Sequence, residues 1–188
     1  YETNIEEAGY SDKVADVIYC NDREVDEDLS QTMGGNGIYG FGNNITVYQP
    51  EGRVIAEDGS GGAQTNQIKM ICSQKNDSFT VDDTTKGNGA LTYPVGLITL
   101  DEVIAAGGYT YNFPSNYIYY LYTGDYYWTM SPSVFADGNA YEWSVVSGGS
   151  VNSGAVHATR GVRPVVSLKS DVQLSGSGTQ SDPWVVQS

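Results

Sequence analysis

Two stretches near the C-terminal end of the chain have the residue pattern of strands. Residues 126–133 read YYWTMSPS, and residues 161–168 read GVRPVVSL. Aromatic and β-branched side chains suit the half-buried surface of a sheet, so each stretch is predicted to form a strand of the core. Between them, residues 134–160 are small, polar and aromatic residues interrupted by single apolar positions. This interval has the pattern of a displayed surface.

Single apolar residues divide the interval into inward and outward positions, because side chains of a strand alternate between its two faces. We predict that the inward, scaffold residues are Phe135, Ala140, Val145, Val151 and Val156. We predict a ligand-binding surface made of Ala136, Asp137, Asn139, Tyr141, Trp143, Ser144, Ser147, Ser150, Asn152, Ser153, Ala155, His157, Ala158 and Arg160. Tyr141 and Trp143 are its aromatic candidates, and Trp143 is also a candidate for the core. An ordinary sheet with one solvated face is the alternative.

The clearest local signal is a short helix that begins after Thr99. Glu102 stands three residues after Thr99, which is the spacing of a capping box. Residues 103–106 carry the helix, and Gly107 with Gly108 supplies its C-terminal cap. The helix is short and apolar, so we expect it to pack against a sheet.

The first hundred residues carry weaker signals. Ser11 as an N-cap, followed by Val14, Val17 and Ile18 at helical spacing, predicts a helix that runs towards residue 20. The acidic residues 21–35 indicate a loop or a solvated face.

Short strands are predicted within residues 44–58, at 68–72 and at 77–81, with a last strand at 182–186. Residues 35–40, GNGIYG, match the G-x-G-x-x-G spacing of a dinucleotide site. No apolar strand precedes them and no helical pattern follows, so we interpret them as glycine-rich turns.

The chain has two cysteines, Cys20 and Cys72, and one histidine, His157. An even pair of cysteines in an acidic chain rich in Tyr, Gly and Ser is typical of a secreted domain with one disulfide, and two buried thiols are the alternative. A bond that closes a loop of about fifty residues contributes about 3–4 kcal/mol. Two cysteines and one distant histidine do not indicate a zinc site, and we predict no metal or cofactor.

The net charge of the chain excludes some classes of binding partner. There are 9 Lys and Arg against 23 Asp and Glu, a formal net charge of -14. This charge disfavours both nucleic acid and anionic membrane surfaces. No apolar run approaches the roughly 18 residues of a membrane span, so no direct membrane insertion is expected. The chain begins at Tyr1 without a signal-peptide pattern, and we expect a mature form or a segment of a longer, anchored protein.

The chain contains 15 Tyr and 23 Gly, together with many Ser and Asn. Adaptable binding surfaces use these residue types, because Tyr gives contact area at low entropic cost and small polar residues give adaptable hydrogen bonds. Tyr residues that fill the faces of a β-sheet are the alternative explanation.

Several motifs together resemble a known kind of bacterial surface domain. These are YCND at 19–22, NGALTYPVGLITLDEV at 88–103, YYWTMSPS at 126–133, G-x-V at 149–151 and GVRPVVSL at 161–168. They resemble a C-terminal domain of surface proteins from gut anaerobic bacteria, some of which carry a prepilin-like helix that this chain lacks. The resemblance covers most of residues 15–188 and is most specific over 88–168.

The closing GVRP, with Gly148, Gly149 and Ser150 before it, is also similar to the C-terminal part of the formylglycine-generating-enzyme type of C-type lectin fold. Proteins diversified by retroelements use this fold, and their variable segment corresponds to residues 134–160. The resemblance implies an α+β, C-type lectin-like fold, with short helices on a small twisted antiparallel sheet and long ordered loops. It implies a single domain over 1–188, with an N-terminal elaboration at 1–90 and a lectin-like core at 91–188.

Two departures limit what the resemblance carries over. The enzyme branch needs a reactive cysteine pair near the C-terminal motif, and Cys20 and Cys72 lie far from it in sequence, so no enzyme activity is expected. The calcium-binding motifs of animal C-type lectins are missing, and Gln49-Pro50-Glu51 is only remotely similar to one of them. Arg163, a cation within an apolar stretch, is expected to be buried, paired and structural.

The leading hypothesis is an adhesin-like binding domain at the bacterial cell surface. It would bind a protein or glycan on another cell or on a host surface through residues 134–160. The second hypothesis is a structural pilin-like subunit that contacts other pilus subunits. The third, a formylglycine-generating-type oxidase, has less support. A Ser-His-Asp triad at His157 and a carboxylate pair for glycoside hydrolysis lack supporting motifs.

Overall fold

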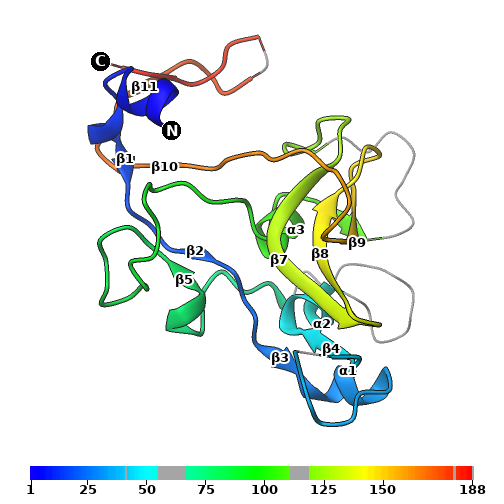
Figure 1. Ribbon diagram of the computed structural model, residues 1–188. Coiled ribbons are helices and arrows are strands. Elements are labelled where there is room, and N and C mark those ends of the chain that lie inside the picture. The colour runs from blue at the N-terminus through cyan, green and yellow to red at the C-terminus, as the bar shows by residue number, and fades with distance from the viewer. Residues whose placement is uncertain (41, 55–66, 111–118, 180, 188) are drawn as a thin grey trace.

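A six-stranded mixed sheet organises the part of the chain that the computed structural model describes, residues 1–40, 42–54, 67–110, 119–179 and 181–187. In spatial order its strands are β3 (Val25–Asp26), β4 (Thr46–Tyr48), β7 (Tyr127–Ala136), β8 (Asn139–Val145), β9 (Ser150–Ala155) and β6 (Tyr109–Thr110). β6 runs parallel to β9, and the other neighbouring pairs are antiparallel. The long strand β7 curves visibly, so the sheet is curled (Figure 1). With a few short helices against this sheet, the fold is α+β, as predicted, but the sheet is mixed because β6 runs parallel to β9, so the expectation of an antiparallel sheet is wrong.

Helix α3 (Leu100–Ala105) confirms the strongest local prediction. Thr99 and Glu102 form the reciprocal capping box. At the other end Gly107 has a φ of 103°. The Gly108 N–H donates to the Val103 carbonyl and the Gly107 N–H donates to the Ile104 carbonyl. This is the paired arrangement of a Schellman cap, so both ends of α3 are determined by local sequence.

The hydrophobic core lies between the sheet and two helices, α2 (Gln49–Val54) and α3. Its buried members are Val54, Leu100, Val103, Ile104, Tyr119, Tyr127, Trp143, Val145 and Val151. A polar residue of β7 also contacts α3, since the Ser131 Oγ accepts a hydrogen bond from the Leu100 N–H at 2.9 Å. One face of the central strands is therefore fixed against the helices.

A buried ion cluster joins the N-terminal part of the chain to this core. The Arg53 guanidinium donates to both carboxylate oxygens of Asp101, at 2.9 and 2.8 Å, and to Asp22 at 2.9 Å. All three side chains are less than 10% exposed. Burial alone lowers the pKa of Arg53, but the bonds and charges of Asp101 and Asp22 outweigh it and hold the pKa above its ordinary value. The Lys69 ammonium lies at the rim of this cluster.

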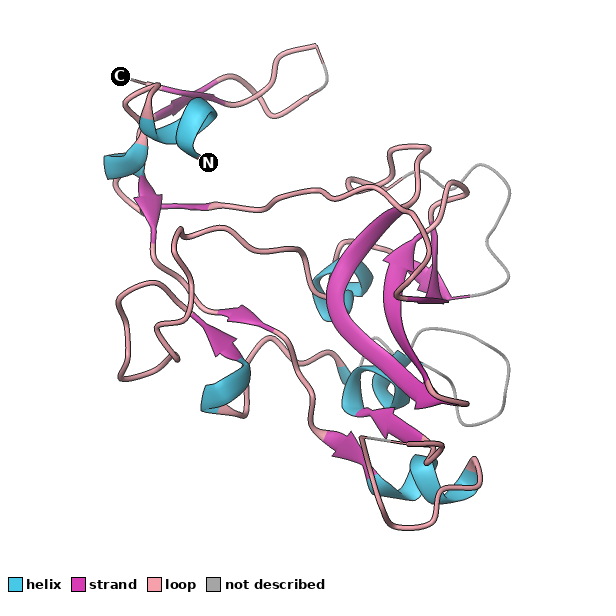
Figure 2. Cartoon of the chain, in the orientation of Figure 1, coloured by secondary structure: helices cyan, strands magenta, loops and turns pink. Residues whose placement is uncertain are grey.

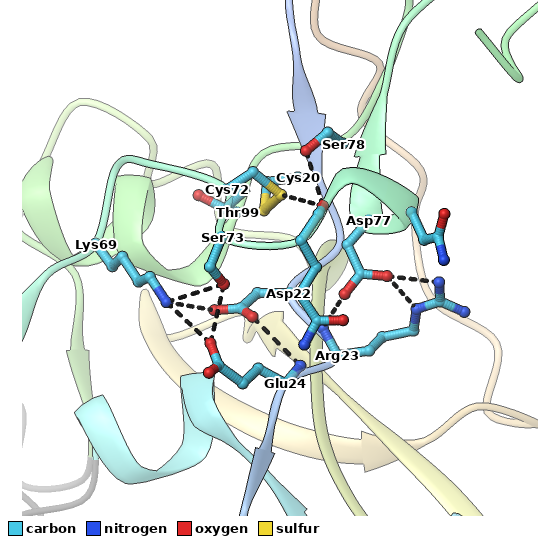
Figure 3. The surroundings of a disulfide bond; sticks show 12 residues. Cys20, Asp22, Arg23, Glu24, Lys69, Cys72, Ser73, Asp77, Ser78 and Thr99 are labelled. Carbon is cyan, nitrogen blue, oxygen red and sulfur yellow. Dashed lines mark hydrogen bonds and ion pairs between the residues drawn. A yellow bond between two sulfur atoms is a disulfide. The ribbon is translucent and has the colours of Figure 1, made fainter. Parts of the chain in front are cut away.

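Cys20 and Cys72 form a disulfide, as predicted, with their Cα atoms 5.5 Å apart and a sequence separation of 52. Figure 3 shows two sets of ionic contacts around it. Lys69 meets Glu24 at 3.2 Å, and the Arg23 side chain donates to the buried carboxylate of Asp77. The disulfide and these ion pairs hold the segment near residue 72 against the segment near residue 20.

Three two-stranded sheets complete the fold of the described residues. They pair β1 (Val14–Ala15) with β10 (Ser167–Leu168), β2 (Tyr19–Cys20) with β5 (Ser78–Phe79), and β11 (Leu174–Ser175) with β12 (Val185–Val186). The helical turns η1 (Glu2–Glu6) and η2 (Ser11–Lys13) lie beside the β11–β12 pair, away from the main sheet (Figure 1). Long loops connect the short elements, as Figure 2 shows.

Several predicted elements are wrong. The helix expected towards residue 20 is a single turn, η2, followed by β1 and β2, because Val14 and Tyr19 are buried in strand pairs. The acidic stretch at 21–35, expected to be a loop or a solvated face, contains β3 and helix α1 (Glu27–Thr32), which is capped by the Asp26 carboxylate and exposes Glu27 and Asp28, so the solvated alternative is right and the loop is wrong. Residues 68–72 have no strand structure, although they bring Cys72 to Cys20.

Other predictions hold in part. Strand β4 lies within residues 44–58, but Val54 belongs to α2, and residues 55–58 lie outside the described residues. β5 and β12 confirm the short strands expected at 77–81 and 182–186. The glycine-rich residues 35–40 follow α1 as turns, with positive φ at Gly37 and Gly40. Within the described residues, no helix has the length and hydrophobicity that a bilayer span requires.

The buried ion cluster predicts a large asymmetry between two substitutions. Arg53→Met leaves Asp22 and Asp101 buried without their main partner, so the free energy of unfolding is expected to fall by about 3–5 kcal/mol. Lys69→Met removes a cation whose side chain is 32% exposed, and the expected loss is about 1 kcal/mol or less. Urea unfolding of both variants measures the difference, and equal losses would contradict the role given to Arg53.

Candidate ligand-binding face

The central strands have a second face that points away from α2 and α3. Trp143, Val145 and Val151 belong to the core cluster with Leu100 and Val103. Because strand side chains alternate, the residues between them point the other way. We call this the outer face and define it by Trp128, Met130 and Pro132 of β7, Glu142 and Ser144 of β8, and Asn152 and Gly154 of β9. The register supports the definition, since Trp128 pairs with Ser144 and Ser144 pairs with Asn152.

Arg160 lies on the outer face and is held there by aromatic rings. Its guanidinium carbon is 4.7 Å from the ring centroid of Trp128 and 5.3 Å from that of Tyr126. Its Nη1 donates to the Ser144 Oγ, which in turn donates to the Asn152 carbonyl at 2.8 Å. Cation–π contacts of this kind contribute about 0.5–2 kcal/mol. The position of Arg160 is therefore fixed before any ligand arrives.

Two glycines make room for this arrangement. A Cβ at Gly154 would run into the guanidinium of Arg160, so β9 needs a glycine where the arginine crosses it. A Cβ at Gly161 would lie 2.8 Å from the Tyr126 carbonyl oxygen. Gly161 instead bonds to β7 twice, donating to the Tyr126 carbonyl at 2.9 Å and accepting from the Trp128 N–H at 3.0 Å. The chain thus returns to the start of β7 directly after Arg160.

Glu142 is the acidic group of the outer face. It lies opposite Pro132 on β7 and Gly154 on β9, neither of which has a side-chain donor. Among the described residues, no hydrogen bond reaches its carboxylate. Burial therefore raises the pKa of Glu142 from 4.5 to about 7. Near neutral pH this residue exchanges a proton with solvent, and it can act as donor or acceptor towards a ligand.

The turn between β7 and β8 is a two-residue hairpin. Ala136 pairs with Asn139, and the intervening Asp137 and Gly138 have φ values of 52° and 73°. Positive φ at both positions is the geometry that a type I′ turn requires, which explains the Asp-Gly sequence. The tip is exposed and displays Asp137 and Asn139 at one end of the sheet.

The structure separates the predicted ligand-binding residues by exposure. The exposed members are Asp137, Asn139, Ser147, Asn152 and His157. The half-buried members are Ala136, Tyr141, Ser150, Ser153, Ala155, Ala158 and Arg160. The buried members are Trp143 and Ser144, at 1% and 0% exposure. Neither buried residue can touch a ligand directly, because Trp143 belongs to the core and Ser144 lies beneath Arg160.

The predicted set also falls on two faces. Tyr141 pairs with Ala155 and Trp143 pairs with Ser153, so Tyr141, Ser153 and Ala155 share the face of Trp143. Asn152 and Arg160 belong to the outer face, whereas Asp137, Ser147 and His157 lie in turns. The structure therefore does not gather the predicted residues into one patch.

The predicted scaffold is right in part. Val145 and Val151 are buried, at 0% and 1% exposure, and Phe135 is half-buried. Ala140 is exposed, and Val156 is 53% exposed in the turn that follows β9, so the inward orientation predicted for both is wrong. Ala140 lies near the hairpin tip, where the sheet extends beyond the helices that cover its core face.

The burial expected for Arg163 is also wrong. Arg163 is exposed, and its guanidinium carbon lies 5.2 Å from the ring centroid of Tyr127. The stretch around it makes isolated bridges, from Gly161 to Tyr127 of β7 and from Val165 to Gly96, and only its last two residues lie in a strand, β10, so the core strand predicted for residues 161–168 is wrong. An edge segment of this kind leaves alternate side chains free to point outwards.

Sequence reasoning missed Glu142, Gly154 and the aromatic pair of Tyr126 and Trp128. The available signal was the alternation itself, because a buried Trp143 places both Glu142 and Ser144 on the opposite face. The predicted outward set instead follows polar residue type between single apolar positions, which does not distinguish the buried Ser144 from the exposed Asn152.

Within the described part of the chain, no group of three or more His, Cys, Asp or Glu side chains is placed to hold a metal ion. Comparisons with protein-family models, with curated proteins and with solved structures give no match to this chain.

The raised pKa of Glu142 predicts a pH-dependent loss of stability. The folded protein holds a proton that the unfolded chain releases near pH 4.5, so this contribution is complete below pH 4.5 and is lost as the pH rises through about 7. At pH 8, Glu142→Gln is expected to raise the free energy of unfolding by up to about 3 kcal/mol, with little effect at pH 4. Denaturant titrations at both pH values measure this, with Glu7→Gln at an exposed position as the control. An equal effect of Glu142→Gln at the two pH values would contradict the assignment.

Proposed function

We propose that this chain is an extracellular ligand-binding domain that binds through residues 134–160. The observation that carries the proposal is the outer face of β7, β8 and β9 with its adjoining turns. There Arg160 is held in place on Tyr126 and Trp128, beside the exposed Asn152 and the titratable Glu142. A rigid aromatic and arginine centre surrounded by small polar residues is the chemistry that adaptable recognition surfaces use.

The proposal includes a C-type lectin-like scaffold diversified by a retroelement. The motifs at residues 88–103 and 126–133 support it by resemblance; here the first runs from the loop before α3 into that helix, and the second covers the start of β7. Residues 134–160 span the end of β7, both β8 and β9, and the turns between them. These turns and outward positions tolerate substitution best in a sheet whose other face is buried.

The proposed location is the bacterial cell surface, and the proposed partner is a protein or glycan on another cell or on a host surface. The disulfide between Cys20 and Cys72 supports an oxidising compartment. The net charge of -14 supports a partner other than nucleic acid.

A structural pilin-like subunit is the second candidate. One observation favours it: large apolar side chains are exposed near the two termini, with Trp184 at 59%, Val185 at 52% and Leu174 at 42%. Exposed apolar residues gathered on terminal strands are common at subunit contacts. Light scattering over a range of protein concentrations separates the two candidates. Self-assembly of the chain through these exposed apolar residues would favour the pilin-like subunit. A formylglycine-generating-type oxidase has less support, because Cys20 and Cys72 lie far in sequence from the motif at residues 161–164.

The binding proposal predicts that exposed residues of the interval can be changed without unfolding. In the triple variant Asn139→Ala/Asn152→Ala/His157→Ala, binding to host cells and to a glycan array is expected to weaken at least about tenfold. The free energy of unfolding is expected to stay within about 0.5 kcal/mol for each site, because these side chains are exposed.

The matched control changes three exposed residues elsewhere, in Lys169→Ala/Asp171→Ala/Gln173→Ala. This variant is expected to bind as the unchanged domain does. Full binding by the first triple variant, or equal loss in both, would count against a ligand surface in residues 134–160.

A further inference from the structure

A cavity of about 300 Å³ lies beside the start of β7, outside residues 134–160. Three segments line it. The loop before β7 contributes Tyr120, Leu121 and Thr123, the segment before α3 contributes Ile98, and the returning chain contributes Arg163, Pro164 and Val165. Tyr127 forms part of the wall. Most of this lining is apolar or aromatic, and Arg163 is its charged member.

Arg163 differs from the two arginines of the N-terminal half. Arg23 and Arg53 each form an ion pair with at least one aspartate. Over the ranges that the structure describes, neither an ion pair nor a hydrogen bond to Arg163 is found, and its guanidinium contacts the ring of Tyr127. In a chain with 23 acidic residues against 9 basic ones, a cation that lines a cavity without a carboxylate partner points to an external anion.

The other polar groups of the cavity limit which anion fits. The Tyr127 hydroxyl donates to the Leu121 carbonyl at 2.9 Å, so it is already used and presents its ring. Tyr120 is 86% exposed, and its ring is available to cover a ligand. The cavity is at the lower end of the volumes typical of small-molecule sites, which corresponds to a body of about one ring. A guanidinium binds a planar carboxylate through two parallel hydrogen bonds.

We propose that this cavity is a subsite for a small carboxylate carried on a single ring. Arg163 binds the carboxylate, while Tyr120, Leu121 and Ile98 contact the ring. An acidic monosaccharide and an aromatic acid share this chemistry, and glucuronate and benzoate represent the two sources. The site lies outside residues 134–160, so it stands or fails independently of the proposed ligand face.

The test is a titration of the whole domain, followed by amide chemical shifts in NMR, with glucuronate, benzoate and their uncharged counterparts glucose and benzyl alcohol. At least one carboxylate is expected to bind saturably and at least about tenfold more tightly than its uncharged counterpart. The shifts are expected at Leu121, Thr123 and Val165, with none at Asn152. Binding of one carboxylate and not the other identifies the source, and saturable binding of neither overturns the proposal.

Two variants test the residue assigned to the charge. Arg163→Gln is expected to weaken carboxylate binding at least about tenfold, whereas Lys169→Gln, which removes one positive charge at an exposed position, should leave it unchanged. Equal weakening in both variants would show non-specific attraction and overturn the site. If Arg163→Gln does not fold, the chemical-shift changes of the unchanged domain on carboxylate binding test the site instead. Changes confined to residues away from the cavity would reject the proposal.

Discussion

The packing of Trp143, Val145 and Val151 against α3 is the constraint on which the rest of the structure depends. Because strand side chains alternate, the burial of these three residues determines which face each of the remaining side chains of β8 and β9 points to. Asn152 and Glu142 are outward for this reason, although their residue types alone would not place them. The ends of α3 are fixed by its capping box and glycine cap, so the helix offers the sheet a defined surface. Exposed positions of the outer face, such as Asn152, can therefore change while the buried face holds the fold.

The return of the chain at Gly161 connects the two candidate binding regions. Gly161 bonds to β7 between Tyr126 and Trp128, which requires a residue without a side chain. Arg160, just before it, lies over Trp128 on the outer face, and Arg163, just after it, lies over Tyr127 beside the cavity. Successive residues of β7 point to opposite faces, so one backbone contact places a cation on each side of the strand.

Three short-range signals in the sequence predicted their elements correctly. The capping box at Thr99 and the β-prone residues at the start of β7 are each recognised from a few neighbouring residues. The two cysteines allow only one pairing. Interactions between distant residues could not be predicted in this way. The Arg53 cluster joins positions 31 and 48 residues apart, and Val14 forms a strand because it pairs with Leu168. Within residues 134–160, Trp143 and Ser144 were predicted to lie on one surface, although neighbours in a strand cannot share a face.

The most direct test of the account is a saturation library of residues 134–160, displayed on cells and sorted for resistance to protease. We predict that Asn139, Ser147, Asn152 and His157 accept most substitutions, because their side chains are exposed. Trp143, Ser144, Val151 and Gly154 should accept few, since each is buried. Equal tolerance of substitution in both groups would contradict the division of residues 134–160 into exposed positions and a buried scaffold.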